Sequence, residues 1–289
     1  CANYLGASIP GASHIQHMPS HTFNRIGRWG DAVRANTDAW LSDLKAEYGE
    51  GFAIYPSHNL HMLLFAASND GQGAVAIQAG KDYADLMDGA NFYEALTMLR
   101  FGRFDDILEL RDPPEGTVFR GLWDFGKGYA HLRTGDEGTA RWYLHRIKTA
   151  IEDDPDGAFR GHSATQLLGV VGAILEGEIL RTDGDLDAAL EVLVKGAETE
   201  DGIRYDEPEP LNFSVYQWLG DALHEAGRHA EAEAAFRHEL TKHPHNGWSL
   251  FGLERALLGQ GKDSQATKVH EEFLLAWARA DTYLRSPIF

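Results

Sequence analysis

The sequence contains a single cysteine, Cys1, among its 289 residues. One cysteine excludes an internal disulfide framework and a cysteine-based zinc site. No run approaches the roughly 20 apolar residues that cross a bilayer; the longest is Leu167–Leu175. No signal peptide is visible. A chain that begins with Cys1 fits either a processed lipoprotein or a piece of a longer chain, so the compartment stays open between bacterial cytoplasm and periplasm.

Positive charge is also scarce. The chain has 26 Lys and Arg against 44 Asp and Glu, which gives a net charge of −18. So acidic a chain repels phosphate backbones and anionic membrane surfaces, and it has no basic tract, so we expect no nucleic-acid partner. The ordinary role of such acidity is solubility. With 43% hydrophobic residues the chain can bury a sizeable core, as one large domain or as a repeat array.

A short signal recurs seven times, in which a glycine is followed five positions later by a small or apolar residue. The pairs are Gly27/Ala32, Gly71/Ala76, Gly102/Ile107, Gly135/Ala140, Gly184/Ala189, Gly227/Ala232 and Gly261/Ala266. Each signal follows one helix-like apolar segment and precedes another. The glycine suits a tight turn that ends a first helix, and the small residue lets a second helix pack closely against it. The pattern predicts about seven helix pairs.

The later units resemble the tetratricopeptide repeat (TPR). Its Leu-Gly pair matches Leu219-Gly220, its small residue Ala232, its aromatic residue Phe236 and its closing proline Pro244. The resemblance implies an all-α, TPR-like α-solenoid, a right-handed superhelix whose first helices line a concave groove.

We expect one repeat domain over residues 1–289, with residues 1–12 as an entering segment. Connecting loops are predicted where Pro, Gly and Asp are dense. The third of the second helices, Phe104–Leu110, is cut short by Pro113-Pro114, and no strand-like alternation persists. The predicted loops are Arg111–Gly116, Asp153–Gly157 and Glu200–Pro210.

Histidines are concentrated in two segments, Ser13–Gly27 and Ser57–Leu64. They hold five of the 14 histidines: His14, His17, His21, His58 and His61. Counted from the turn glycines, the first three occupy positions 2, 5 and 9 of the first unit, and the last two positions 2 and 5 of the second. Three- and four-residue steps stay on one helix face, so the five should converge on the groove.

Pro19 complicates this prediction, because a helix that begins there leaves His14 and His17 in the entering segment. Histidine without cysteine suits a transition metal such as Cu, Fe or Zn at an open or exchangeable site. A carboxylate should orient the ligands, with Glu94, Glu178 and Asp221 as candidates. Without metal, the cluster could act as a general base or bind an acidic peptide at low pH.

The same register places further side chains in the groove, where they could contact a small molecule or a peptide. The alternative is that they pack against the neighbouring unit. Met18 and Met62 are predicted to be core residues rather than copper ligands. The groove positions are Phe125, Tyr129, Glu178, Arg181, Gln217, Asp221, His224, Phe251 and Arg255.

The segment His17-Met-Pro-Ser-His21 and the later His58-Asn-Leu-His61 are similar to the HMPxH and HNxH motifs of a bacterial family of TPR-containing proteins. Further matches are Gly27-Arg-Trp29, Asn36, Asp206-Glu-Pro208, Asn246-Gly-Trp248, Leu250-Phe-Gly-Leu253 and Ala276–Asp281. The resemblance implies a longer protein, of which this is the C-terminal half. A missing upstream half or a second chain could then complete the site.

Two readings of function remain. The first is a TPR-like protein that holds a transition metal at the groove histidines and could be an enzyme for redox or hydrolytic chemistry on a small organic substrate. The second is a non-catalytic scaffold that binds a peptide or protein partner in the groove. A metal-handling site without turnover is a variant of the first.

Overall fold

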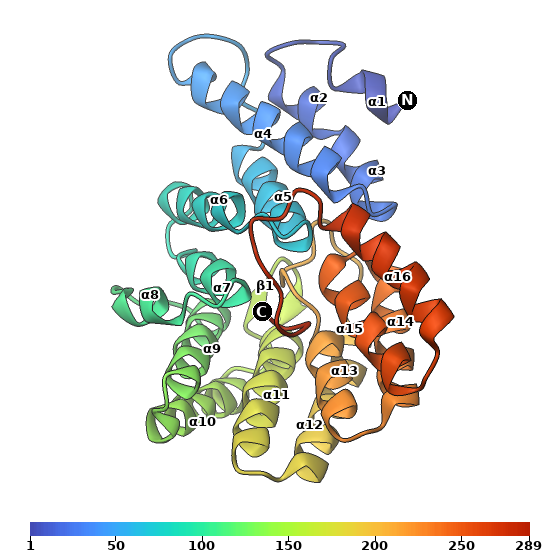
Figure 1. Cartoon of the computed structure of the whole chain (residues 1–289). Helices are drawn as coiled ribbons and strands as arrows, with labels where there is room; N and C mark the ends of the chain where they lie inside the picture. The colour runs from blue at the N-terminus through green and yellow to red at the C-terminus, as the bar shows by residue number, and fades with distance from the viewer.

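The computed structural model describes residues 1–289 and is almost entirely helical. After the short α1 (Ala2–Leu5), seven helix pairs follow one another along the chain (Figure 1). The predicted all-α, TPR-like solenoid is confirmed. The pairs are α2 (Ser13–His17) and α3 (Pro19–Arg25) with α4 (Trp29–Ala46), α5 (Pro56–Asn69) with α6 (Gly73–Leu86), α7 (Phe92–Arg100) with α8 (Phe104–Glu109), α9 (Thr117–Arg133) with α10 (Glu137–Asp153), α11 (Ala164–Thr182) with α12 (Leu186–Asp201), α13 (Val215–Glu225) with α14 (His229–Lys242), and α15 (Gly247–Gly259) with α16 (Asp263–Ala276).

The seven turn glycines all adopt left-handed backbone angles, with φ between 66° and 89°. That region is open to glycine at little cost, so each helix can end and the chain can reverse within a few residues. The partner residue five positions on is buried in every pair, from Ala32 to Ala266. A small side chain there lets the two helices of a pair approach closely.

Two features depart from a regular repeat. As predicted, α8 is only six residues long and ends before Pro113. Between α10 and α11, a region expected to be only loop, the chain forms a small antiparallel hairpin of β1 (Ala158–Phe159) and β2 (His162–Ser163). Its two turn residues, Arg160 and Gly161, both have positive φ, which is the backbone of a tight two-residue hairpin turn.

The solenoid closes on itself. In Figure 1 the pairs descend on one side and return on the other, so that α16 lies beside the first helices. The indole Nε1 of Trp29 donates to the Pro244 carbonyl at 2.9 Å. On the same seam, Arg279 holds Asp70 through two hydrogen bonds, of 2.6 and 2.9 Å. The first two pairs are therefore joined to the end of the array, which no sequence signal indicated.

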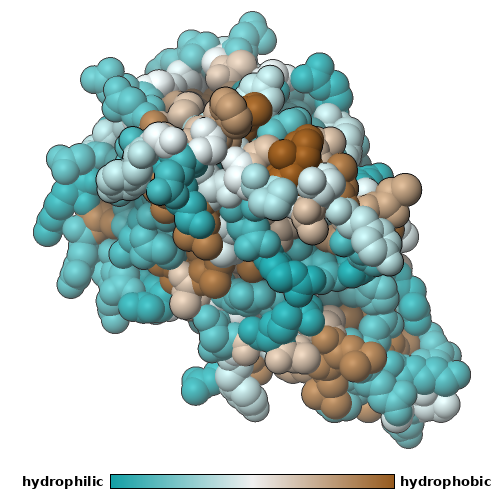
Figure 2. All heavy atoms as spheres, turned by 90° about the horizontal axis from the view of Figure 1, so that it is seen from above, coloured by the Kyte–Doolittle hydropathy of each residue, from teal (hydrophilic) through white to brown (hydrophobic).

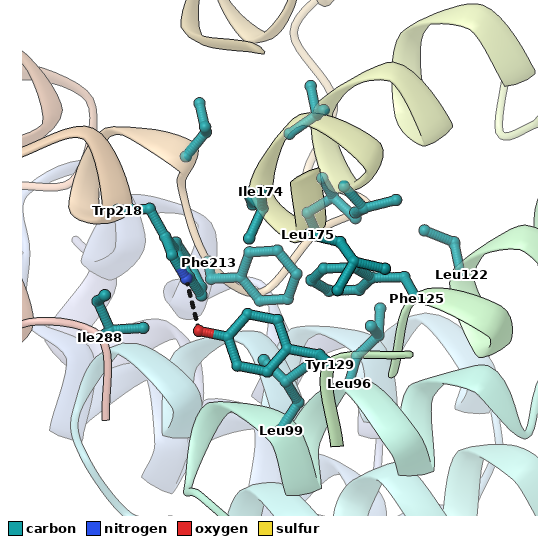
Figure 3. Packing of buried hydrophobic residues seen from close by; sticks show 14 of the residues in the cluster. Leu96, Leu99, Leu122, Phe125, Tyr129, Ile174, Leu175, Phe213, Trp218 and Ile288 are labelled. Atoms are coloured by element: carbon teal, nitrogen blue, oxygen red, sulfur yellow. Dashed lines mark hydrogen bonds between the residues drawn. The ribbon is translucent and has the colours of Figure 1, made fainter. Parts of the chain in front are cut away.

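The inside of the ring is occupied by two segments, which we call the inner loop (residues 202–214) and the tail (residues 277–289). Asn212 of the inner loop donates to Ser68 on α5 at 3.0 Å, and Arg100 on α7 donates to the carbonyl of Ile288 in the tail at 3.1 Å. Figure 3 shows Phe213 and Ile288 packed beside Tyr129 of α9. These contacts join the units into one hydrophobic cluster of 57 buried residues.

The outer surface fits the acidic composition. Figure 2 shows a largely hydrophilic face on which hydrophobic residues lie in small separate groups. None of the helices combines the length and apolarity that a membrane span requires.

Candidate metal centre

Pro19 bends the first helix without separating its histidines. It is the first residue of α3, and Met18 before it keeps right-handed helical angles. The amide of Met18 also donates to the carbonyl of His14 at 3.0 Å, so α2 runs almost directly into α3. His17 and His21 therefore stay one helical turn apart on the same side, and their Nε2 atoms lie 2.8 Å from each other.

His58, on the first turn of α5, completes a group of three. The ring centroid of His58 lies 4.6 Å from that of His17 and 5.5 Å from that of His21. One ring nitrogen from each of the three histidines can be chosen so that all lie within 4.8 Å of one another. Two histidines from one helix and a third from its neighbour are therefore gathered around one point, as the repeat register predicted for these three.

Asn36 on α4 fixes the tautomer of His17. The Asn36 amide nitrogen donates to the Ala32 carbonyl, which turns its Oδ1 toward His17. That oxygen lies 2.8 Å from His17 Nδ1 and can only accept. The proton of neutral His17 is therefore on Nδ1, and the lone pair of Nε2 points toward His21.

Glu207, in the inner loop, plays the same part for His21. Its Oε2 lies 3.1 Å from His21 Nδ1. The hydrogen bond from His21 holds the pKa of Glu207 below its usual value against the opposing effect of burial, so this carboxylate only accepts. Neutral His21 consequently also carries its proton on Nδ1.

The two tautomers together create an electrostatic requirement. Two nitrogen lone pairs facing each other at 2.8 Å repel unless a positive charge stabilises them. Either His21 takes a second proton and donates to His17, or a cation lies between the rings. In a tetrahedral zinc site, bonds of 2.0–2.1 Å place ligand nitrogens about 3.3 Å apart, so a modest opening of the two rings would admit the ion.

Burial keeps His17 and His58 neutral. Removal from water is the main cause that lowers the pKa of His17 from 6.5 to about 3, and the charges of the neighbouring histidines contribute to the same shift. Burial also lowers the pKa of His58 to about 4, aided by His21 and by Arg160. At neutral pH these two imidazoles are therefore neutral, the form that binds a metal.

Two further buried polar atoms lie at the group without a hydrogen-bond partner. They are Nδ1 of His14, whose ring stacks on His17 at 5.8 Å, and Oε1 of Glu207. Buried polar atoms are seldom left unpaired in a folded protein. Each is a possible fourth ligand or a partner for a bound water.

His61, also predicted as a ligand, points away from the group. The guanidinium of Arg160, which can only donate, lies 3.1 Å from His61 Nδ1. His61 Nε2 must then carry the proton and donate to the Tyr93 hydroxyl at 2.6 Å, and that hydroxyl donates to the Pro210 carbonyl at 2.8 Å. Both ring nitrogens are thus used by the protein, and His61 is not placed with His17, His21 and His58.

Arg160 reaches His61 from the turn of the β1–β2 hairpin. Its φ of 53° is unfavourable for a residue other than glycine. The side chain is held by two hydrogen bonds to Asp206, of 2.6 and 2.8 Å. Because Asp206 precedes Glu207, this ion pair anchors the part of the inner loop that carries the His21 partner.

The other predicted groove residues lie elsewhere in the ring. Glu178, Arg181 and Asp221 line a cleft of about 720 Å³ that the tail borders. Arg181 bonds to Glu178 at 2.6 Å and to Asp221 at 3.0 Å. Tyr129 is buried below them, where it donates to Glu178 and accepts from Trp218 (Figure 3).

Arg255 and His224 are also outside the lining of that cleft. Arg255 lies 3.4 Å from Asp221, and His224 lies 3.1 Å from His229. Phe125 follows the alternative prediction, packing between units, because its side chain is fully buried in the core. Met62 is also fully buried, as predicted.

The residues that orient the His17 and His21 rings are not the carboxylates predicted from the sequence. Glu94 pairs with Lys81, while Glu178 and Asp221 pair with Arg181. The partners are instead Asn36 and Glu207. Both are among the residues through which the chain resembles the HMPxH family, and that resemblance was the only signal for them.

Comparison with known proteins adds little beyond this geometry. The chain matches no protein-family model and no curated protein. It is similar to a solved structure of a MamA mutant, with 18% identity over 76% of this chain and 96% of that one and a TM-score of 0.35. A second MamA structure gives 14% identity over 80% and 99%, with a TM-score of 0.38. The TPR-like fold therefore rests on the helix pairs themselves, and the narrower HMPxH family stays a prediction.

Proposed function

We propose that this protein is a helical-repeat scaffold that holds a transition-metal ion between His17, His21 and His58. The facing Nε2 lone pairs of His17 and His21 carry the proposal, since they need a positive charge between them and burial keeps His17 itself neutral. Asn36 and Glu207 orient the two rings from behind, as partners of metal-bound histidines do.

Three neutral imidazoles suit Zn, Cu, Fe or Ni. Three protein ligands leave a coordination position for water or a substrate, which is the arrangement of catalytic rather than structural zinc sites. The side chain of His21 is 28% exposed, so the group can be reached from solvent. Redox or hydrolytic chemistry on a small organic molecule is the activity that such a position would allow.

Metal content of protein purified without a histidine tag tests the proposal. We expect close to one equivalent after incubation with Zn²⁺ or Cu²⁺ and dialysis. The double change His21→Ala and His58→Ala should abolish binding while helical content is kept. His270→Ala is the matched control, because that exposed histidine only pairs with Glu254. Less than about a tenth of an equivalent in the unmodified chain would exclude the site.

The cleft beside the tail supports a second function, the binding of a peptide or protein partner. The tail forms one wall of it, with the Arg133 guanidinium 4.7 Å from the centroid of the Phe289 ring. A labelled peptide of residues 282–289 should therefore bind to a chain shortened after Asp281. Arg133→Ala should weaken that binding. Arg237→Ala should not, because Arg237 pairs with Glu233 on α14 and is not in the lining of the cleft. Equal binding by both variants would refute this function.

A further inference from the structure

A cavity of about 270 Å³ lies beside the inner loop. It is enclosed by the inner loop and by the ends of α3, α12 and α14. Its lining residues are Arg25, Glu200, Asp201, Ile203, Arg204, Tyr205, Glu209, Pro210, Leu211, Phe213, Thr241 and Lys242. Cavities of about this size and larger hold small organic ligands in proteins.

Part of the cavity wall is apolar, and its lining includes two exposed arginines. Ile203, Leu211 and Phe213 supply hydrocarbon surface. Arg25 and Arg204 are exposed, and neither guanidinium lies within 4.0 Å of a carboxylate oxygen. Arg25 instead lies over the Tyr205 ring, 5.0 Å from its centroid. Both guanidinium groups can therefore bind an incoming anion without first breaking an ion pair.

Each carboxylate in the lining has a partner in the structure. Glu200 accepts from the Ser214 hydroxyl at 2.5 Å and from the Val215 amide at 2.7 Å, and burial raises its pKa to about 7. Asp201 pairs with Lys242 and Glu209 with His243. Arg25 and Arg204 are thus the two cations of the lining that form no ion pair.

We propose that this cavity binds a small monocarboxylate with an aromatic or branched apolar body. The hydrocarbon part would lie against Leu211 and Phe213, and the carboxylate would bind Arg25 and Arg204. Arginine suits this role because its planar guanidinium can donate two parallel hydrogen bonds to a carboxylate.

The cavity is connected to the candidate metal centre through one hydrogen-bond chain. The hydroxyl of Tyr205, a lining residue, donates to Glu207 Oε2 at 2.5 Å, and the same oxygen accepts from His21. A carboxylate in the cavity competes for the Tyr205 hydroxyl, which leaves Glu207 a stronger acceptor for His21 and His21 a more basic ligand. The ligand should therefore tighten metal binding. This second step rests on the proposed function, whereas binding in the cavity does not.

Titration of the metal-free chain with benzoate and phenylacetate, followed by calorimetry and by protein NMR shifts, tests the cavity alone. We expect saturable binding that Arg204→Met and Arg25→Met each weaken about tenfold or more, the effect of a lost charge-assisted hydrogen bond. Arg34→Met is the matched control, because Arg34 is exposed and pairs only with Asp31. Equal loss in the control, no binding up to about 10 mM, or preference for benzylamine over benzoate would overturn the proposal.

Zinc titrations with and without saturating benzoate test the connection. In the unmodified chain we expect benzoate to raise zinc affinity about three- to tenfold, and zinc must raise benzoate affinity by the same factor. Tyr205→Phe keeps the ring beneath Arg25 and removes the hydroxyl, so benzoate should still bind but no longer change zinc affinity. An effect of equal size in Tyr205→Phe would refute the hydrogen-bond chain. Benzoate binding to a chain that takes up no zinc would support the cavity while refuting the metal site.

Discussion

Replacement of Glu207 by Gln tests whether the inner loop belongs to the candidate metal centre. Gln has nearly the same shape and can still accept from His21 Nδ1 through its amide oxygen, but it lacks the charge. Partners of this kind contribute about 10- to 100-fold to metal affinity, or about 1.4–2.8 kcal/mol. The side chains of His21 and Glu207 are 28% and 19% exposed, so solvent screens part of the interaction. We therefore expect a loss near the lower end, about tenfold.

Competition between the protein and a chelating dye of known zinc affinity measures this loss directly. His21→Ala, which removes the ligand itself, should lose more than Glu207→Gln. Tyr205→Phe is the control, because it removes the hydrogen bond from the Tyr205 hydroxyl to Glu207 Oε2 and keeps the one from His21. Glu207 should then accept more strongly from His21, and zinc affinity should be unchanged or slightly higher. Unchanged affinity in Glu207→Gln, with His21→Ala strongly impaired, would show that the 3.1 Å contact has no part in holding the metal.

Three further predictions concern other contacts. Gly27→Ala and Gly227→Ala both place a side chain at φ near 70°, which costs about 1 kcal/mol of folding free energy in each case. A Cβ at Gly27 would also lie 2.0 Å from the Pro244 carbonyl oxygen, whereas a Cβ at Gly227 would contact nothing. Gly27→Ala should therefore lose clearly more unfolding free energy in urea, and equal losses would contradict the packing at the seam. His243, between Glu209 and Glu239, has its pKa raised well above 6.5 by their charges. Its stabilisation is complete below pH 6.5 and is lost as the pH rises through the raised pKa, so His243→Gln should cost more stability at pH 6 than at pH 9, and the reverse order would refute the assignment. Asn36→Ala leaves His17 Nδ1 without its partner, so zinc affinity should fall about tenfold or more in the dye assay, and an unchanged value would show that the tautomer of His17 is set otherwise.

The sequence was most informative where local chemistry decides the structure. The turn glycines and the small residues after them predict the seven pairs, because a left-handed turn and a close helix contact each restrict residue choice. The register of His17, His21 and His58 followed from the same count. The register could not separate His61 from them, because the direction of the His61 ring is set by Tyr93 of the next unit and by Arg160 of the hairpin.

Contacts between distant segments account for most of what was missed. Glu207 reaches His21 only because the inner loop crosses the ring, and Arg160 reaches Asp206 only through a hairpin with a left-handed turn. Neither contact leaves a periodic trace in the sequence. The cleft around Arg181 was found in part, because it is formed by successive first helices, whose facing positions the repeat does define.

The seam between the first and last pairs has a consequence for how the protein unfolds. In an open array each repeat touches only its neighbours, so the ends can fray one unit at a time. Here Trp29 is hydrogen-bonded to Pro244 across 215 residues of chain, so the two ends of the array are joined to each other. We expect unfolding to be cooperative rather than stepwise from the ends. The turn that follows the helix of His17 and His21 lies at this seam, beside α16, so damage to α16 should be felt at the candidate metal centre although the two are far apart in sequence.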